Sequence, residues 1–256
     1  MRFGIPITLM QRDHSNKPVI IDIDYQRRLL SIMKLGLSHT NPQLFDQLYK
    51  TPTQKVFATS AYFPNATFMK DQIILNQDGK LVLFFSTADT DLGLNFYNAF
   101  MYLHLLSTGN NQKTIIYNHH IDAQVGKLYR VEVPAITQNV ALFKTMSPIV
   151  LRDRTRTEYF ITGEDNTQED LDKFTQELRF NTMMKLDKHP ELKLYVKDLT
   201  FTPIKMKRTI RKAYNLSYPV SKGLFELSGN PALLTFLQDT GLGQETGSCA
   251  GLISKV

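Results

Sequence analysis

The last stretch of the chain, Leu227–Val256, constrains the fold most, because it joins a well-marked helix to a glycine-rich loop. Asn230 and Pro231 begin the helix. The Asn oxygen can accept a hydrogen bond from a free backbone N–H, and proline at the first helical position costs no hydrogen bond within the helix. Gly241 ends it. An apolar stripe for a core is formed by Leu233, Leu234 and Leu237. The sequence therefore predicts a helix packed at both ends and along one side.

The loop after this helix has glycines at four positions, Gly241, Gly243, Gly247 and Gly251, with Ser248 and other polar residues between them. Such a loop can turn backbone N–H groups outward together, which suits an anionic oxygen. By itself it is more often a tight connection between a helix and a strand. Nucleotide-binding fingerprints do not fit, because they follow a strand and open a helix.

Hydrophobic periodicity predicts the remaining elements. In the first half we expect strands at Arg2–Met10, Lys55–Phe63, Asp71–Gln77, Lys80–Ser86, Lys113–Ile121 and Leu128–Ile136, and helices at Asp24–Leu37, Pro42–Tyr49 and Thr90–Leu106. In the second half we expect strands at Ala141–Leu151, Tyr159–Thr162, Leu192–Thr209 and Tyr218–Ser228, and a helix at Thr167–Leu186 before the final helix and strand. Asp78 and Gly79 predict a two-residue hairpin between neighbouring strands. The order strand, helices, strands, helix, strand is typical of a ferredoxin-like unit.

Several stretches resemble one family along the whole chain. These are KVFATSAYF (Lys55–Phe63), LVLFFSTADTDLG (Leu81–Gly93), MSPIVLRDR (Met146–Arg154), GLFELSGNPALL (Gly223–Leu234) and the final GLGQETGSCAGLI. In this order they resemble the CRISPR-associated endoribonucleases that cut precursor CRISPR RNA within its repeats, the Cas six family of the RAMP superfamily. The loop departs from the family pattern, because Cys249 and Ala250 replace a usual glycine and aromatic.

The resemblance implies an α+β fold of tandem ferredoxin-like (RRM-like) domains, each an antiparallel sheet with helices on one face. We place the N-terminal domain at residues 1–137 and the C-terminal domain at 138–256. It also implies RNA cleavage without a metal or cofactor, in which a ribose 2′-hydroxyl attacks the adjacent phosphate and leaves a 2′,3′-cyclic phosphate and a 5′-hydroxyl. CRISPR repeat RNA is the expected partner, effector-complex subunits are further candidates, and homodimerisation is left open.

Composition fits a polyanionic partner. The chain has 256 residues and a formal net charge of +6, which favours RNA without proving it. The N-terminus lacks the plan of a signal peptide and no apolar run is long enough to span a membrane, so we expect a cytoplasmic protein. Cys249 is the only cysteine, which excludes an internal disulfide and a multi-cysteine zinc site.

Two basic clusters are candidates for RNA contact. The first is Arg152, Arg154 and Arg156, which alternate with other residues and would project to one side of an extended segment. The second is Lys205, Lys207, Arg208, Arg211 and Lys212. Alternatively, each cluster is a solvated strand edge on which charge discourages aggregation. With the resemblance, we interpret both, together with Gly241, Gly243, Gly247 and Ser248, as the RNA-binding surface.

Cleavage needs a proton acceptor, a proton donor and a cation for the crowded phosphate. The family uses a trio resembling histidine, tyrosine and lysine, and Lys55 matches the lysine position. Where many relatives have histidine, this chain has Tyr49. The nearby His39, expected in the turn before the second helix, is the better proton carrier near neutral pH. Tyr49 and His39 remain alternatives, since the ends of an intervening helix lie roughly 10 Å apart.

Two other functions remain open on the sequence. One is a non-catalytic subunit that binds CRISPR repeat RNA within an effector complex. The other is a basic ferredoxin-like module unrelated to CRISPR, which would bind RNA with no preference for repeats.

Overall fold

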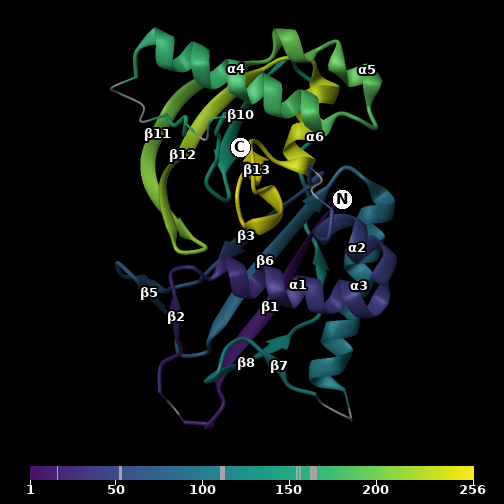
Figure 1. The fold of residues 1–256 in the computed structure, drawn as a ribbon, viewed down its shortest axis with the longest axis vertical. Helices are drawn as coiled ribbons and strands as arrows, with labels where there is room; N and C mark the ends of the chain where they lie inside the picture. The colour runs from purple at the N-terminus through teal and green to yellow at the C-terminus, as the bar shows by residue number, and fades with distance from the viewer. Residues whose placement is uncertain (16, 52–53, 110–112, 154, 156, 162–165) are drawn as a thin grey trace.

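The computed structural model describes residues 1–256 except 16, 52–53, 110–112, 154, 156 and 162–165. Figure 1 shows two units, one above the other, each with its own antiparallel sheet. The N-terminal unit, coloured purple to teal, is the lower one, and most of the green-to-yellow chain forms the upper one. None of the helices in the described ranges is long and apolar enough to cross a membrane.

The N-terminal unit has a ferredoxin-like strand order. Its elements are β1 (Arg2–Gln11), α1 (Gln26–Thr40), α2 (Pro42–Tyr49), β3 (Phe57–Tyr62), β6 (Lys80–Thr87), α3 (Thr90–Thr108), β7 (Ile115–Ile116), β8 (Ile121–Val125) and β9 (Tyr129–Arg130). The strands lie in the order β3-β6-β1-β8-β7, and β9 pairs with β1. The first strand is therefore central, between β6 and β8, as in a split β-α-β unit.

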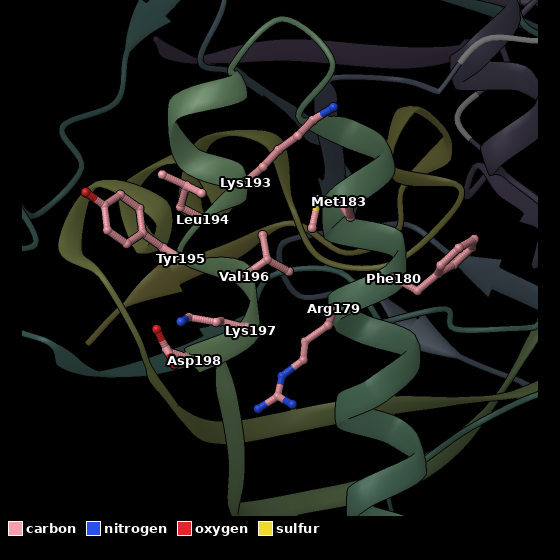
Figure 2. Close-up of a pocket in the computed structure, with 9 residues that line it drawn as sticks. All are labelled: Arg179, Phe180, Met183, Lys193, Leu194, Tyr195, Val196, Lys197 and Asp198. Carbon is pink, nitrogen blue, oxygen red and sulfur yellow. The ribbon is translucent and has the colours of Figure 1, made fainter.

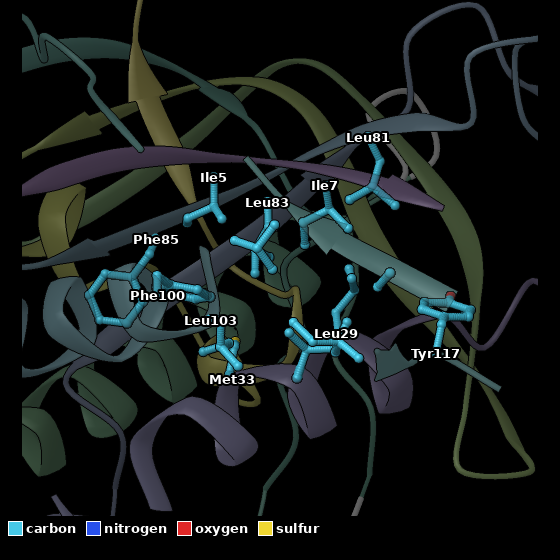
Figure 3. Close-up of a cluster of buried hydrophobic side chains, with 14 of the residues drawn as sticks. Ile5, Ile7, Leu29, Met33, Leu81, Leu83, Phe85, Phe100, Leu103 and Tyr117 are labelled. Carbon is cyan, nitrogen blue, oxygen red and sulfur yellow. The ribbon is translucent and has the colours of Figure 1, made fainter. Parts of the chain in front are cut away.

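Alternation along the strands places the core of this unit between the sheet and the helices α1 and α3. Figure 3 shows the side chains that meet there: Ile5, Ile7, Leu81, Leu83 and Phe85 from the sheet, Leu29 and Met33 from α1, and Phe100 and Leu103 from α3. Each such side chain stabilises the fold by about 1.5–3 kcal/mol relative to an exposed position.

A small separate sheet contains β2 (Ile20–Asp22), β5 (Gln72–Ile74) and β4 (Thr67–Phe68) in the order β2-β5-β4. A tight turn does form here, centred on Gln77 and Asp78, with the Gly79 N–H bonded to Asn76 O at 2.9 Å and Gly79 at φ 61°. However, β5 pairs with β2 and β4, whereas β6 pairs with β1 and β3. The predicted hairpin is wrong because the Gly79 carbonyl accepts from the Leu9 N–H at 2.9 Å, so the turn docks on β1.

The C-terminal unit repeats the plan. Its elements are β10 (Val140–Thr145), α4 (Gln168–Lys185), α5 (Pro190–Lys193), the 3₁₀ turn η1 (Val196–Asp198), β11 (Thr200–Ala213), β12 (Leu216–Ser228), α6 (Pro231–Thr240), the 3₁₀ turn η2 (Thr246–Ser248) and β13 (Ile253–Lys255). The strand order β11-β12-β10-β13 again places the first strand of the unit between the third and the fourth. The α+β, tandem ferredoxin-like prediction is confirmed. The boundary at residues 137/138, which falls between β9 and β10, stays a prediction.

The final helix forms as the sequence indicates. The Asn230 side chain accepts from the Ala232 N–H at 2.9 Å, and Pro231 begins α6. Gly241 follows the helix with φ 79°, a left-handed value that suits glycine. Leu233, Leu234 and Leu237 are all fully buried in the C-terminal core.

Several predicted strands are shorter than expected. The range predicted as Leu192–Thr209 begins instead with the end of α5 and with η1, because Pro190 opens a helical turn that buries Leu192 and Val196. In the N-terminal unit, β7, β8 and β9 are also short. After β10, Arg152 and Glu158 form only an isolated bridge, where a strand pair was predicted; Thr162 lies outside the described residues.

The two units are joined by buried hydrogen bonds along β3. Ser60 Oγ donates to Met146 O at 2.7 Å, and Ser147 Oγ donates to Thr59 O at 3.0 Å. Arg2, on β1, donates from its guanidinium to the carbonyls of Gln238 (2.6 Å) and Ile253 (2.9 Å). A buried guanidinium needs such acceptors, so the interface is fixed by specific polar contacts as well as by apolar packing.

Candidate functional site

The glycine-rich loop packs between the two units, where Figure 1 shows the yellow end of the chain. Gly247 lies so close to β3 that an added Cβ would be 2.8 Å from the ring of Phe57. At Gly241, an added Cβ would be 2.7 Å from the Cβ of Ala58. The loop is glycine-rich here because backbone must approach the neighbouring unit closely.

The backbone N–H groups of the loop described below bond to the protein interior. This corrects the expectation that they turn outward together to bind an anionic oxygen. The N–H of Leu242 bonds to Gly251 O, that of Gln244 to Val150 O, and that of Gly251 to Pro148 O, each at 2.8 Å. Cys249 donates to Thr59 Oγ1 at 2.8 Å. The loop is held by these bonds because it is largely buried, and buried N–H groups need partners. RNA contact by Gly241, Gly243, Gly247 and Ser248 stays a prediction.

Beside this loop, two lysines converge on one tyrosine. Lys34 Nζ, from α1, lies 4.6 Å from the ring centroid of Tyr49 at the end of α2. Lys55 Nζ lies 5.4 Å from the same centroid and donates to Leu48 O. A Cβ added to Gly247 would be 3.5 Å from Lys55 Cγ, so the cluster borders the loop. We call Lys34, Tyr49 and Lys55 the lysine–tyrosine cluster.

The environment shifts the protonation of this cluster. Burial raises the pKa of the Tyr49 phenol well above its usual range, with a smaller contribution from Tyr214. Burial also lowers the pKa of Lys55, with an added contribution from the charge of Lys34. The Tyr49 hydroxyl is buried and has no hydrogen-bond partner among the described residues. Tyr49 therefore stays protonated at neutral pH and can donate a proton or a hydrogen bond.

His39 lies apart from the lysine–tyrosine cluster. It belongs to the last turn of α1, not to the turn before α2 as expected, because α1 continues to Thr40. Its ring stacks on Tyr102 of α3 at 5.2 Å, and its Nδ1 bonds to Leu35 O at 2.9 Å. Lys34 and His39 are about 140° apart around the helix at 3.6 residues per turn. His39 thus faces α3, whereas Lys34 faces Tyr49.

Arg152 lies against the glycine-rich loop, and its contact with RNA stays a prediction. Its guanidinium contacts the carboxylate of Glu245 and lies 4.6 Å from the ring centroid of Tyr218. Arg211 is buried and donates to Cys249 O at 2.7 Å and to Ser248 O, so it supports the loop from behind. Arg154 and Arg156 lie outside the described residues.

The second basic cluster spreads over β11. Arg208 lies over the ring of Phe160 at 4.7 Å, and Lys212 pairs with Asp71 of the N-terminal unit. Lys207 lies opposite Lys222 on β12. Lys144 and Lys222, which the sequence did not single out, complete a basic face with Lys207. Burial lowers the pKa of Lys222, and the nearby charges of Lys207 and Lys144 lower it further. Lys205, on the same strand, pairs with Leu224.

A separate hollow of about 780 Å³ lies between α4 and the segment of α5 and η1 (Figure 2). Arg179 and Lys197 lie on either side of it, and Met183, Leu194 and Val196 contribute apolar lining. It contains none of the residues predicted to bind or cleave RNA, so we place the site at the loop.

Sequence comparison identifies the C-terminal half. Residues 131–254 match the family model for the C-terminal region of CRISPR associated protein Cas6. Residues 131–254 of this chain are thus related to the C-terminal region of the Cas6 family. The Cas6 family is known for CRISPR RNA processing. Among curated proteins, none matches the sequence.

Solved structures share the fold across the whole chain. "An RAMP protein binding different RNA substrates" is 18% identical, with a TM-score of 0.76, and the match covers 100% of this chain and 99% of that one. "Characterization of a Cas6-related gene from Pyrococcus furiosus" is 17% identical, with a TM-score of 0.74 and the same coverage. A Cas6 product complex is 16% identical, with a TM-score of 0.63, over 100% of both chains. At these identities the likeness establishes the fold.

Lys34 is the residue of the lysine–tyrosine cluster that the sequence did not single out. Arg27 and Lys34 are seven residues apart, which places them on one face of α1. Arg27 lies 5.9 Å from the ring centroid of Tyr214, on the β11–β12 turn, so this face of α1 points toward the loop region. That spacing was a readable signal for a cationic helix face.

Proposed function

We propose that this chain is a Cas6 endoribonuclease that cleaves precursor CRISPR RNA within its repeats, without a metal, through attack of a 2′-hydroxyl on the adjacent phosphate. The match of residues 131–254 to the Cas6 family supports RNA processing. The observation that carries the proposal for this chain is the lysine–tyrosine cluster beside the glycine-rich loop. The cluster presents two cations and a protonated phenol, which suit a phosphate that gains negative charge in the transition state.

The residues have different roles in this proposal. Lys55, together with Lys34, stabilises the charge that develops on the phosphate. Tyr49 donates a proton to the leaving 5′-oxygen, since its raised pKa keeps it protonated. The proton of the attacking 2′-hydroxyl passes to water, because no side chain of the cluster is assigned to accept it. His39 is not assigned this role, because its ring stacks on Tyr102 between α1 and α3, away from the lysine–tyrosine cluster.

The position of His39 favours a second candidate, a Cas6 that binds repeat RNA without cutting it. Without an imidazole at the lysine–tyrosine cluster, the site has cations for binding but lacks a proton acceptor near neutral pH. In this case the protein holds CRISPR repeat RNA, alone or with effector-complex subunits. Both candidates place the protein in the cytoplasm, and neither requires a homodimer.

One experiment separates the two candidates. Purified protein is incubated in EDTA with repeat RNA from the CRISPR arrays of its own genome. A discrete cut within the repeat that leaves a cyclic phosphate end supports the nuclease. Tight binding with no cut supports the second candidate. Equal affinity for repeat RNA and for a scrambled RNA of the same length would contradict both.

A further inference from the structure

The carboxylate of Glu245 fills a cage of hydrogen-bond donors at the start of η2. One carboxylate oxygen contacts the guanidinium of Arg152. The other accepts from the Tyr218 hydroxyl at 2.6 Å and lies 3.5 Å from the Arg211 guanidinium. These residues come from the loop, β11, β12 and the segment after β10, so the donors are fixed by separate elements.

The bonding pattern forces Tyr218 to donate toward this position. Arg211 Nε donates to the Tyr218 hydroxyl at 3.0 Å, and a guanidinium has no acceptor. The single phenolic proton therefore points to Glu245. Burial raises the pKa of Tyr218 to about 12, so the proton is kept at neutral pH. The cage is thus built to hold an anionic oxygen, whichever group supplies it.

Arg152 has donor capacity that Glu245 does not use. Its Nε is buried and has no hydrogen-bond partner among the described residues. A carboxylate offers two oxygens in one plane. A phosphodiester offers two oxygens that share the negative charge on a tetrahedral centre, and its ester oxygens are further acceptors. The phosphodiester carries the same single negative charge as the carboxylate, so an exchange would leave the net charge of the cage unchanged.

We propose that a backbone phosphate of bound RNA replaces the Glu245 carboxylate between Arg152 and Tyr218, so that Glu245 occupies a phosphate subsite until RNA arrives. This inference rests on the proposed RNA binding and specifies one of its contacts. The site is reachable, because the side chains of Arg152 and Glu245 remain 18% and 27% exposed. Arg211 stays behind the loop, where it bonds to Cys249 O and holds the Tyr218 hydroxyl.

Glu245→Gln tests the exchange, because it keeps the shape of the side chain and removes the competing charge. The first probe is inorganic phosphate, with the melting temperature followed at constant ionic strength. The second is RNA affinity, measured by fluorescence anisotropy with repeat RNA. Glu169→Gln is the matched control, since Glu169 is 75% exposed on α4 and its loss changes the net charge equally.

The expected result is a phosphate-dependent rise in melting temperature for Glu245→Gln that is absent in the wild type and in Glu169→Gln. RNA affinity should increase about three- to tenfold, as expected when one partly exposed competing charge is removed. Adding Arg152→Gln should abolish both gains. Weaker RNA binding by Glu245→Gln, with no response to phosphate, would show instead that Glu245 only braces the loop.

Two further measurements keep the outcomes distinct. If Glu245→Gln does not fold, Tyr218→Phe serves in its place, and it should weaken RNA binding about three- to tenfold. Unchanged RNA affinity in that variant would overturn the phosphate subsite. A wild type that neither binds nor cuts repeat RNA would refute the proposed function. The phosphate response of Glu245→Gln would still test the cage in that case, because this measurement needs no RNA.

Discussion

Removing the Tyr49 hydroxyl should change stability and activity in opposite directions. The hydroxyl is buried without a hydrogen-bond partner among the described residues, although the ring packs against Phe45 and the two lysines. Folding therefore removes the hydrogen bonds that this hydroxyl makes to water and does not replace them with bonds to the described residues. At Tyr49, the proposed role as proton donor gives a reason for keeping such a group.

The size of both effects follows from this environment. An unsatisfied buried hydroxyl costs about 1–3 kcal/mol. Because Tyr49 is only partly buried as a residue, we expect Tyr49→Phe to stabilise the protein by about 1 kcal/mol, or about 2–4 °C in melting temperature for a chain of this size. Loss of a proton donor should lower the cleavage rate by roughly 10² to 10⁴.

The assay combines denaturant unfolding with single-turnover cleavage of repeat RNA. Tyr117→Phe is the matched control, because the Tyr117 hydroxyl is also buried and unpartnered among the described residues but lies in the hydrophobic core of the N-terminal unit. The control should gain similar stability and keep its full rate. A destabilised Tyr49→Phe, or one that cuts at the wild-type rate, would refute the reasoning.

Three further predictions concern lysine and histidine residues. Lys55→Met should slow cleavage by about 10² to 10³ in the single-turnover assay, whereas Lys50→Met, an exposed neighbour at the end of α2, should not; equal rates would remove Lys55 from the site. His39→Ala should slow cleavage less than tenfold, because its ring stacks on Tyr102, and a loss of about 10² or more would restore it as the proton carrier. Burial lowers the pKa of Lys185 to about 7, and its amine donates to Gly241 O. The unfolded chain, with a lysine pKa of about 10.4, binds more protons between these values, so stability should rise with pH, by about 2 kcal/mol from pH 7 to 9 relative to Lys185→Met. Denaturant unfolding at both pH values checks this, and parallel curves for the two proteins would contradict it.

Local signals in the sequence predicted the local structure well. Asn230, Pro231 and Gly241 fixed the ends of α6 because capping depends only on adjacent residues. The Asp78–Gly79 turn also formed, but its partner did not follow from sequence, since pairing was decided by contact with Leu9, far away in the chain.

The candidate site was predictable only in part, for the same reason. Tyr49 and Lys55 could be named from the resemblance, whereas Lys34 joins them only through the angle between α1 and α2. The glycine spacing indicated a tight loop, but it could not show that Thr59 on β3 would bind the amide of Cys249. Bonds between the two units are invisible to a pattern read along one segment.

The guanidinium of Arg2 joins the beginning of the chain to carbonyls near its end, at Gln238 and Ile253. During synthesis, this cation has neither of these acceptors until Gln238 and Ile253 have been made. We therefore expect the first unit to emerge from the ribosome with the Arg2 guanidinium still hydrated, and to join the second unit only after Ile253 has emerged.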